Sequence, residues 1–225
     1  MLTNRAENDY LHLRTLIADM CHTVLSMLED TSKAIMEQNE DLAARVVTRD
    51  KEVDALDLRV DNYCLKLLAL YGPKAADLRY IVAALRIIVD MERIGDHCKF
   101  VSRQVGKRHY APAIRYAEDF SALLSSTKLM LHSAVEAIFE QNVEKAMTVV
   151  LMDDNIDKIY NNISKSLLAG ISENISNASL IFSFRNVVRR FERIADHAAN
   201  IAETVPYMVS GTIIRHTEIN VEKPL

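Results

Sequence analysis

The chain has 225 residues, with 5 glycines and 4 prolines where average usage would give roughly 27 of the two together. So few turn-forming residues argue against a many-stranded sandwich or barrel, which needs a turn about every 8 to 12 residues. Hydrophobic residues make up 49% of the chain and charged residues 26%, so a sizeable core can be buried. The net charge of −4 and the lack of a polybasic run argue against binding to nucleic acid or to an anionic membrane.

The sequence predicts neither a membrane span nor a secretory signal. The longest apolar stretch, residues 80–91, is interrupted by Arg86 and Asp90 and is shorter than the roughly 20 residues that cross a bilayer. The first ten residues are polar and acidic and lack the apolar segment of a signal peptide. We therefore expect a cytoplasmic protein that is peripheral to a membrane at most.

Six helices are predicted in chain order. Apolar residues from Leu13 to Ile35 recur every three or four positions, which predicts a helix that ends near Gln38. A strong turn signal at residues 71–73 separates the second helix from the third. Gly211 ends the helical pattern. The remaining helices are predicted over residues 42–70, 75–105, 113–141, 143–170 and 176–209, with a basic linker at 107–112 and a tail at 212–225.

Two blocks of sequence recur, which indicates an internal duplication. Residues 34–54 match residues 137–157 at an offset of 103, with 10 of 21 positions identical. The motif ERIGDH at 92–97 matches ERIADH at 192–197 at an offset of 100, with 5 of 6 identical. We therefore predict an all-α fold of two tandem, duplicated three-helix bundles, over residues 1–106 and 113–211.

Paired carboxylates stand on two helices of the first copy. Asp50 and Asp54 are four residues apart, as are Glu92 and Asp96, so each pair shares one helix face. Residues at equal distance from the turn of an antiparallel hairpin lie level with each other. The midpoints of 54 with 92 and of 50 with 96 are both 73, inside the predicted turn, so the four carboxylates are expected to lie level.

The second copy repeats this arrangement with Asp153, Asp157, Glu192 and Asp196. Here both midpoints are 174.5, which falls in the polar break at residues 172–177. Four ionised carboxylates at one level repel each other unless they are solvated, protonated or bound to cations. Oxygen ligands favour ions such as Mg²⁺, Mn²⁺, Ca²⁺ or iron. A metal site in each copy is therefore predicted, and the alternative is a solvated acidic face.

The neighbours of these carboxylates are predicted to have other roles. His97 and His197 lie about 100° around the helix from the adjacent aspartate, which favours packing or support of a ligand over direct metal binding. Arg93 and Arg193 also lie off the carboxylate face, and we expect them to form ion pairs with a neighbouring helix.

With ERIGDH at residues 92–97 and RFERIADHAANIAE at residues 190–203, the chain resembles the PhoU family of phosphate-signalling proteins over nearly its whole length. The resemblance implies two similar three-helix bundles that hold clusters of iron, manganese, magnesium or zinc. It also implies a regulator that couples a phosphate ABC transporter to a sensor histidine kinase, with the transporter ATPase and the kinase as partners, and a homodimer. By resemblance the ligands are Asp50, Asp54, Glu92, Asp96, Asp153, Asp157, Glu192 and Asp196.

Two other functions compete with this interpretation. A carboxylate-bridged metal enzyme would need Glu-x-x-His pairs projecting into a bundle, and the chain contains none. It also lacks a P-loop, a GxSxG and a GxGxxG motif, so we expect no enzyme. A purely structural helical adaptor without metal is the second alternative.

The two sites are predicted to differ in affinity. In the first copy Lys99 and Arg103 lie about 20° either side of Glu92, whereas Ala199 and Glu203 take these places in the second. A fixed positive charge weakens the binding of a cation nearby. The second site is therefore expected to bind more tightly, although Asp57 and Asp61 of the first copy, replaced by Tyr160 and Ser164 in the second, act the other way.

Overall fold

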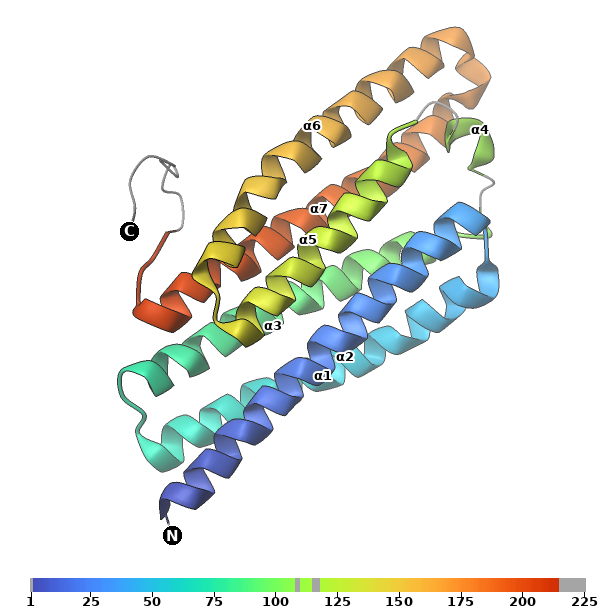
Figure 1. Cartoon of the computed structure of the whole chain (residues 1–225). Coiled ribbons are helices and arrows are strands. Elements are labelled where there is room, and N and C mark those ends of the chain that lie inside the picture. Colours follow the sequence, from blue (N-terminus) through green and yellow to red (C-terminus); the bar gives the residue numbers. More distant parts are fainter. Residues whose placement is uncertain (1, 108–109, 115–117, 215–225) are drawn as a thin grey trace, which may run out of the picture.

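The computed structural model describes residues 2–107, 110–114 and 118–214, and its chain is almost entirely helical (Figure 1). A short helix α4 (Ala111–Ile114) and a turn of 3-10 helix (Ile175–Asn177) lie in the connections. The predicted all-α fold with six long helices is confirmed. The long helices are α1 (Leu2–Glu37), α2 (Glu40–Tyr71), α3 (Ala76–Ser102), α5 (Phe120–Glu140), α6 (Val143–Glu173) and α7 (Ala178–Ser210).

The helices form two three-helix bundles, α1–α3 and α5–α7, joined where α3 packs along α7 (Figure 1). Each helix buries an apolar stripe in a continuous core. The core of the second bundle contains an aromatic cluster, in which Phe120 lies edge to face with Phe184 and Phe191 at centroid distances of 5.0 and 5.8 Å. Each such buried side chain contributes about 1.5–3 kcal/mol to the hydrophobic free energy of folding.

The repeated Glu-Gln-Asn motif forms the same turn in both bundles. Gln38 and Gln141 adopt positive φ angles of 53° and 52°, which ends the preceding helix. The side chains of Asn39 and Asn142 then accept hydrogen bonds from the backbone N–H of Leu42 and Lys145, at 3.0 and 2.9 Å. Asparagine at this position caps the first turn of the next helix. The longest repeated block therefore reflects a helix connection as well as the acidic positions.

Both predicted hairpin turns are present. Gly72 ends α2 with a φ of 53°, a conformation that glycine adopts without steric cost. Asn174 ends α6, and its side chain accepts a hydrogen bond from the N–H of Ser176 in the 3-10 turn.

Two helix starts differ from the prediction. Helix α1 begins at Leu2, well before the first apolar repeat, and α5 begins at Phe120 rather than residue 113. Residues 108–109 of the predicted linker and 215–225 of the predicted tail lie outside the described residues.

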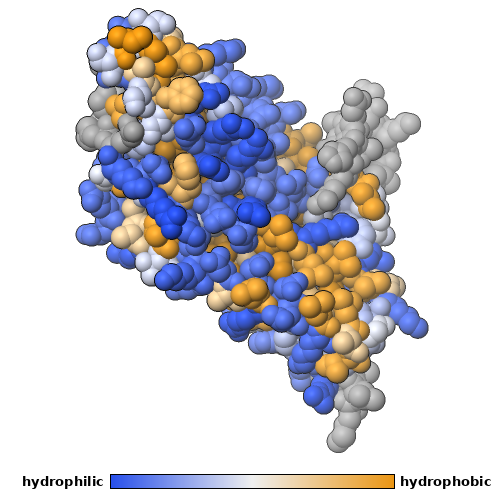
Figure 2. All heavy atoms as spheres, turned by 180° about the vertical axis from the view of Figure 1, so that it is seen from behind, coloured by the Kyte–Doolittle hydropathy of each residue, from blue (hydrophilic) through white to orange (hydrophobic). Residues whose placement is uncertain are grey.

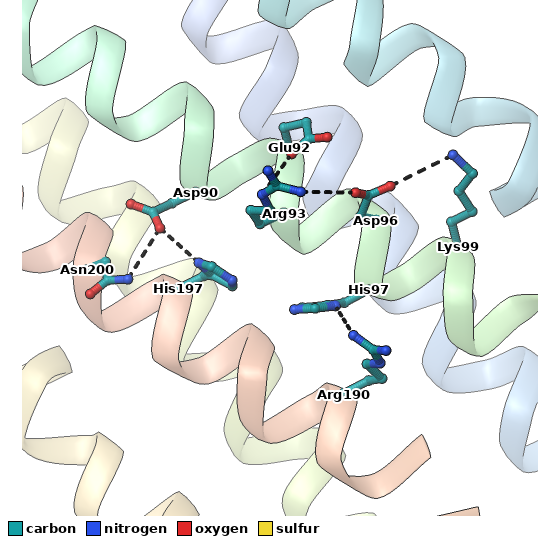
Figure 3. Close-up of polar contacts among 9 residues, drawn as sticks. All are labelled: Asp90, Glu92, Arg93, Asp96, His97, Lys99, Arg190, His197 and Asn200. Atoms are coloured by element: carbon teal, nitrogen blue, oxygen red, sulfur yellow. Dashed lines mark hydrogen bonds and ion pairs between the residues drawn. The ribbon is translucent and has the colours of Figure 1, made fainter. Parts of the chain in front are cut away.

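The contacts between α3 and α7 are related by approximate two-fold symmetry. Asp90 Oδ1 lies 2.8 Å from His197 Nδ1, and a guanidinium nitrogen of Arg190 lies 3.2 Å from His97 Nδ1. At the offset of 100, residue 90 is equivalent to 190 and residue 97 to 197. Each contact is therefore the other one with α3 and α7 exchanged. The rings of His97 and His197, themselves equivalent, meet between them at a centroid distance of 5.5 Å (Figure 3).

A second pair of equivalent contacts shows how the two ends of this joint between α3 and α7 have diverged. Asn200 donates a hydrogen bond of 3.3 Å to Asp90 at one end. At the other end Arg190 lies over the ring of Phe100, 4.1 Å from its centroid. One end therefore holds a carboxylate among polar partners, and the other holds a guanidinium against an aromatic ring.

The surface is mixed in character. Seen from behind, hydrophilic residues cover its middle, and hydrophobic residues gather toward the lower end, where Figure 1 places the α2–α3 turn (Figure 2). Leu70 and Leu78 flank this turn and are exposed. Among the described helices, none is long and apolar enough to cross a membrane.

Candidate metal centres

The structure places the predicted carboxylates on two antiparallel helix pairs. Across the first pair, Gly95 lies directly against Val53, since a Cβ at Gly95 would be 3.4 Å from a Val53 methyl carbon. This contact places the acidic stretches of α2 and α3 side by side, and the midpoint of 53 and 95 is 74, one residue from the midpoint of 73 that the acidic pairs share. The first cluster comprises Asp50 and Asp54 on α2 with Glu92 and Asp96 on α3, and the second comprises Asp153 and Asp157 on α6 with Glu192 and Asp196 on α7.

Lys99 lies within the first cluster. Its Nζ forms a close ion pair with Asp50, whose side chain is 4% exposed. The same Nζ lies 3.8 Å from Asp96 Oδ1, as Figure 3 shows. The hydrogen bond with Asp50 is the main cause that raises the pKa of Lys99. A buried carboxylate needs a compensating positive charge. In this cluster the chain supplies that charge itself.

The second cluster has no such lysine, because Ala199 stands at the equivalent position. Asp153 Oδ1 and Glu192 Oε2 are both buried and have no hydrogen-bond partner among the described residues. Burial, reinforced by the charges of Asp196 and Asp157, raises the pKa of Asp153 to about 6. Burial is also the main cause that raises the pKa of Glu192 and of Asp196. This cluster therefore holds more negative charge than its surroundings compensate.

Among the described residues, Arg93 and Arg193 form ion pairs only within their own helices, so the predicted pairs with a neighbouring helix are wrong. Arg193 Nη1 lies 2.9 Å from Asp196, and its Nε lies 3.6 Å from Glu192 on the same helix. Arg93 spans Glu92 and Asp96 in the same way, at 3.4 and 3.6 Å (Figure 3). Residues three apart on a helix are neighbours, so each arginine meets the aspartate of its own motif, and its long side chain also reaches back to the preceding glutamate. Each arginine can be displaced into solvent by a cation that binds the two carboxylates.

The two histidines lie in the α3–α7 joint rather than in the acidic clusters. Burial, followed by the charge of Arg190, lowers the pKa of His97 to about 4, so its ring is neutral and can accept from that arginine. Sequence reasoning did not single out Asp90, which hydrogen-bonds to the ring of His197, or Arg190, which donates to the ring of His97. Their equivalence at the offset of 100 is the signal that could have identified them.

As the side chains stand, no three Asp, Glu, His or Cys residues in the described part of the chain are grouped closely enough to hold a metal ion. The two clusters differ in how well they fit one. A hard cation would satisfy the buried oxygens of Asp153 and Glu192, which have no hydrogen-bond partner among the described residues. In the first cluster the ammonium of Lys99 already satisfies Asp50. The second cluster fits a metal ion, and the first does so only if Lys99 moves away.

Together, the fold and the acidic motifs define an all-helical protein made of two similar three-helix bundles, each with carboxylates facing one another across a hairpin. The PhoU domain model matches residues 17–105 and 120–205. The chain belongs to the PhoU family.

The relatives and solved structures agree with this assignment. The chain is 31% identical to a phosphate-specific transport system accessory protein PhoU homolog of Deinococcus radiodurans, over 86% of this chain and 91% of that protein. It is 28% identical to the PhoU accessory protein of Escherichia coli, over 91% of this chain and 85% of that one. The crystal structure of PhoU from Pseudomonas aeruginosa superposes with a TM-score of 0.86 at 26% identity, over 92% of this chain and 99% of that one. A phosphate transport system regulatory protein PhoU from Streptococcus pneumoniae, at 21% identity and a TM-score of 0.81, shares the fold over 92% and 98%.

Proposed function

We propose that this chain is an accessory regulator of phosphate transport and not an enzyme. The observation that carries the proposal is the family membership across both repeats, with relatives named as accessory proteins of a phosphate-specific transport system. In this proposal the chain acts in the cytoplasm as a homodimer, with the transporter ATPase and a sensor histidine kinase as its partners. It represses the phosphate-starvation response when phosphate is plentiful.

The proposal includes a metal ion in the second repeat. Asp153, Asp157, Glu192 and Asp196 would hold it, and its charge would neutralise the carboxylates that now repel one another. Two observations support this assignment: the buried oxygens of Asp153 and Glu192 lack hydrogen-bond partners among the described residues, and an alanine stands where the first repeat has Lys99. Iron, manganese, magnesium and zinc are the candidate ions, with oxygen ligands favouring the harder ones.

The regulatory part is tested by deleting the gene in its own host and measuring phosphate-starvation transcripts in high phosphate. We expect these transcripts to rise in the deletion strain and to return to the repressed level when the wild-type gene is restored. Normal repression without the protein would refute the regulatory role.

The metal part is tested by restoring instead a gene for the variant Glu192→Ala/Asp196→Ala, with Glu92→Ala/Asp96→Ala as the matched control. Immunoblotting shows that each variant is present at the level of the wild type. Loss of repression in the first variant alone is expected if the second cluster is needed for regulation. Full repression by both would assign the regulation to a helical adaptor that works without metal.

A further inference from the structure

A cleft lies between α3 and α7, on the side of the joint that carries Arg190. It encloses a volume of about 450 Å³, lined by His97, Phe100, Asn186, Arg189, Arg190 and Arg193. A neighbouring hollow of about 320 Å³ shares its wall of His97, Phe100 and Arg190 and adds one carboxylate and three cations, Asp96, Arg93, Lys99 and Arg103. Residues three or four apart on a helix share a face, so Asn186 and the three arginines of α7 point to the same side.

The charge of these arginines is only partly compensated. Arg93 and Arg193 are paired with carboxylates of their own helices. Arg190 instead contacts the ring of Phe100 and the Nδ1 of His97, which accepts its hydrogen bond. Within the described residues, Arg103, Arg189 and Arg190 form no ion pair with a carboxylate, although Arg189 lies near enough to Glu192 to lower the pKa of that carboxyl slightly against its burial.

Within the described part of the chain, the Asp90 end of the joint between α3 and α7 has no such excess of positive charge, so the packing of the two helices does not by itself require it. There Asp90 has His197 and Asn200 as hydrogen-bond partners, and all three side chains are at least partly buried. Arg190 is held in place by a ring face and one ring nitrogen, so most of its five N–H groups remain available. A guanidinium fixed in this way loses little conformational entropy when it binds a ligand.

We propose that this cleft binds the phosphate group of a small molecule, with Arg190 and Arg189 as its principal ligands. A planar guanidinium donates two parallel hydrogen bonds to phosphate oxygens, and such charge-assisted bonds are about twice as strong as neutral ones. A volume of about 450 Å³ lies within the range of small-molecule sites, roughly 300–1,000 Å³. The phosphate group can belong to free inorganic phosphate or to a phosphorylated metabolite with an organic part against Phe100. This inference is independent of the metal assignment.

The test is isothermal titration calorimetry of the full chain, freed of metal with a chelator so that no bound cation can capture an anion. Inorganic phosphate, AMP and adenosine are titrated separately. Arg190→Gln and Arg189→Gln remove the proposed ligands, and Arg45→Gln, an exposed arginine of α2 far along the chain, removes the same charge elsewhere. Melting temperatures show whether each variant is folded, and Arg189, being exposed, keeps the test informative if Arg190→Gln unfolds.

We expect AMP or inorganic phosphate to bind and adenosine not to bind. Arg190→Gln should weaken binding about tenfold and Arg189→Gln several-fold, and Arg45→Gln should leave it unchanged. Binding of AMP alone identifies a phosphorylated metabolite as the ligand, and equal binding of inorganic phosphate identifies the free ion. The proposal is overturned if neither anion binds at millimolar concentration, which would point to carboxylates of a partner protein. It is also overturned if adenosine binds as well as AMP or if Arg45→Gln weakens binding as much as Arg190→Gln.

Discussion

The two acidic clusters have the same four positions on equivalent helix pairs and one arginine each, yet only the first also contains a lysine. In the first, Lys99 places an ammonium against Asp50. In the second, Ala199 takes its place, and Asp153 and Glu192 have buried oxygens without a hydrogen-bond partner among the described residues. The comparison shows that equivalent carboxylate positions do not make equivalent sites, because the nearest fixed positive charge decides how much of the negative charge the chain itself compensates.

The difference has a thermodynamic consequence. A lysine attached to the chain is always present, so the first cluster is stable without any ligand. With the proposed cation, the stability of the second cluster would depend on the concentration of that ion, since a ligand that binds only the folded state stabilises it more as its concentration rises above its Kd. On this proposal the first repeat would keep its stability without metal, and the second would respond to the metal supply.

The largest expected effect is the loss of the tight metal site in Glu192→Ala/Asp196→Ala. Removing a residue that only hydrogen-bonds to a metal ligand lowers metal affinity about 10–100-fold. The loss of two ligands themselves should therefore lower it about 1,000-fold or more. Helix content should stay nearly unchanged, because these side chains lie at the surface of the bundle. Elemental analysis and a Mn²⁺ titration measure the effect, with Glu92→Ala/Asp96→Ala as control. Equal metal content in the wild type and both variants would contradict the ligand assignment.

The next largest effect is expected for Lys99→Ala. Breaking a buried ion pair by removing one partner destabilises a protein by about 3 kcal/mol, because the remaining charge is buried without compensation. Urea denaturation in a chelator should show this loss. Added Mn²⁺ should restore most of it, since the emptied first cluster then resembles the second. If the metal gives no recovery, the first cluster is not a latent metal site.

The reciprocal change tests the same idea in the second repeat. Ala199→Lys should place an ammonium among the carboxylates there and weaken metal binding about tenfold or more, because each unit charge within a few ångströms contributes on the order of 1–4 kcal/mol. The same titration measures it. Undiminished affinity would mean that the added lysine points into solvent.

Asp153→Asn and Asp50→Asn should shift stability in opposite directions in the absence of metal. Folding raises the pKa of Asp153 from 3.8 to about 6, so its favourable contribution is complete below pH 3.8 and is lost as the pH rises through 6. At pH 7.5 the ionised carboxylate should cost about 1 kcal/mol after screening by solvent, and the amide removes that cost. Asp50→Asn instead removes the partner of Lys99 and should destabilise by about 1 kcal/mol. Denaturation at pH 7.5 and pH 4 distinguishes the two, and a loss of stability in both variants would contradict the comparison.

The smallest effect is expected for Arg103→Glu. Arg103 is exposed and forms no ion pair with a described carboxylate, whereas Lys99 reaches into the cluster. An exposed charge contributes about 0–1 kcal/mol, so metal affinity of the first cluster should rise by less than about fivefold while Lys99 remains. In the variant Lys99→Ala/Arg103→Glu, the gain should be mostly that of Lys99→Ala alone. A larger effect of Arg103→Glu than of Lys99→Ala would reverse this ranking.

The sequence predicts the architecture because its signals are local or repeated. Apolar periodicity marks the six helices, and the midpoints of the acidic pairs fall in the two hairpin turns. Features that depend on side-chain reach are not predicted. Arg93 and Arg193 pair with the glutamate before them and the aspartate three residues on, where we expected partners on a neighbouring helix, and the start of α1 at Leu2 has no apolar signal.

The joint between the repeats was also not predicted. Asp90 and Arg190 are a hundred residues apart, and their contacts depend on how α3 packs along α7 rather than on any spacing within one helix. In the clusters themselves, Lys99 was identified as a nearby cation. Its ion pair with Asp50, however, depends on the distance between α2 and α3, which the sequence pattern does not give.

The exchanged contacts between α3 and α7 also bear on ancestry. In a symmetric dimer every contact occurs twice, and a residue on the axis meets its own copy. His97 contacts His197, and the contact of Asp90 with His197 has a symmetry-equivalent contact of Arg190 with His97. A single three-helix unit with such a surface is complementary to itself, so the present joint has the form of a dimer interface that gene fusion made internal. In a dimer of identical subunits, the two contacts on either side of the axis would be made by the same residues. Only within one fused chain can position 90 be an aspartate and the equivalent position 190 an arginine, so that one end of the joint is acidic and the other basic.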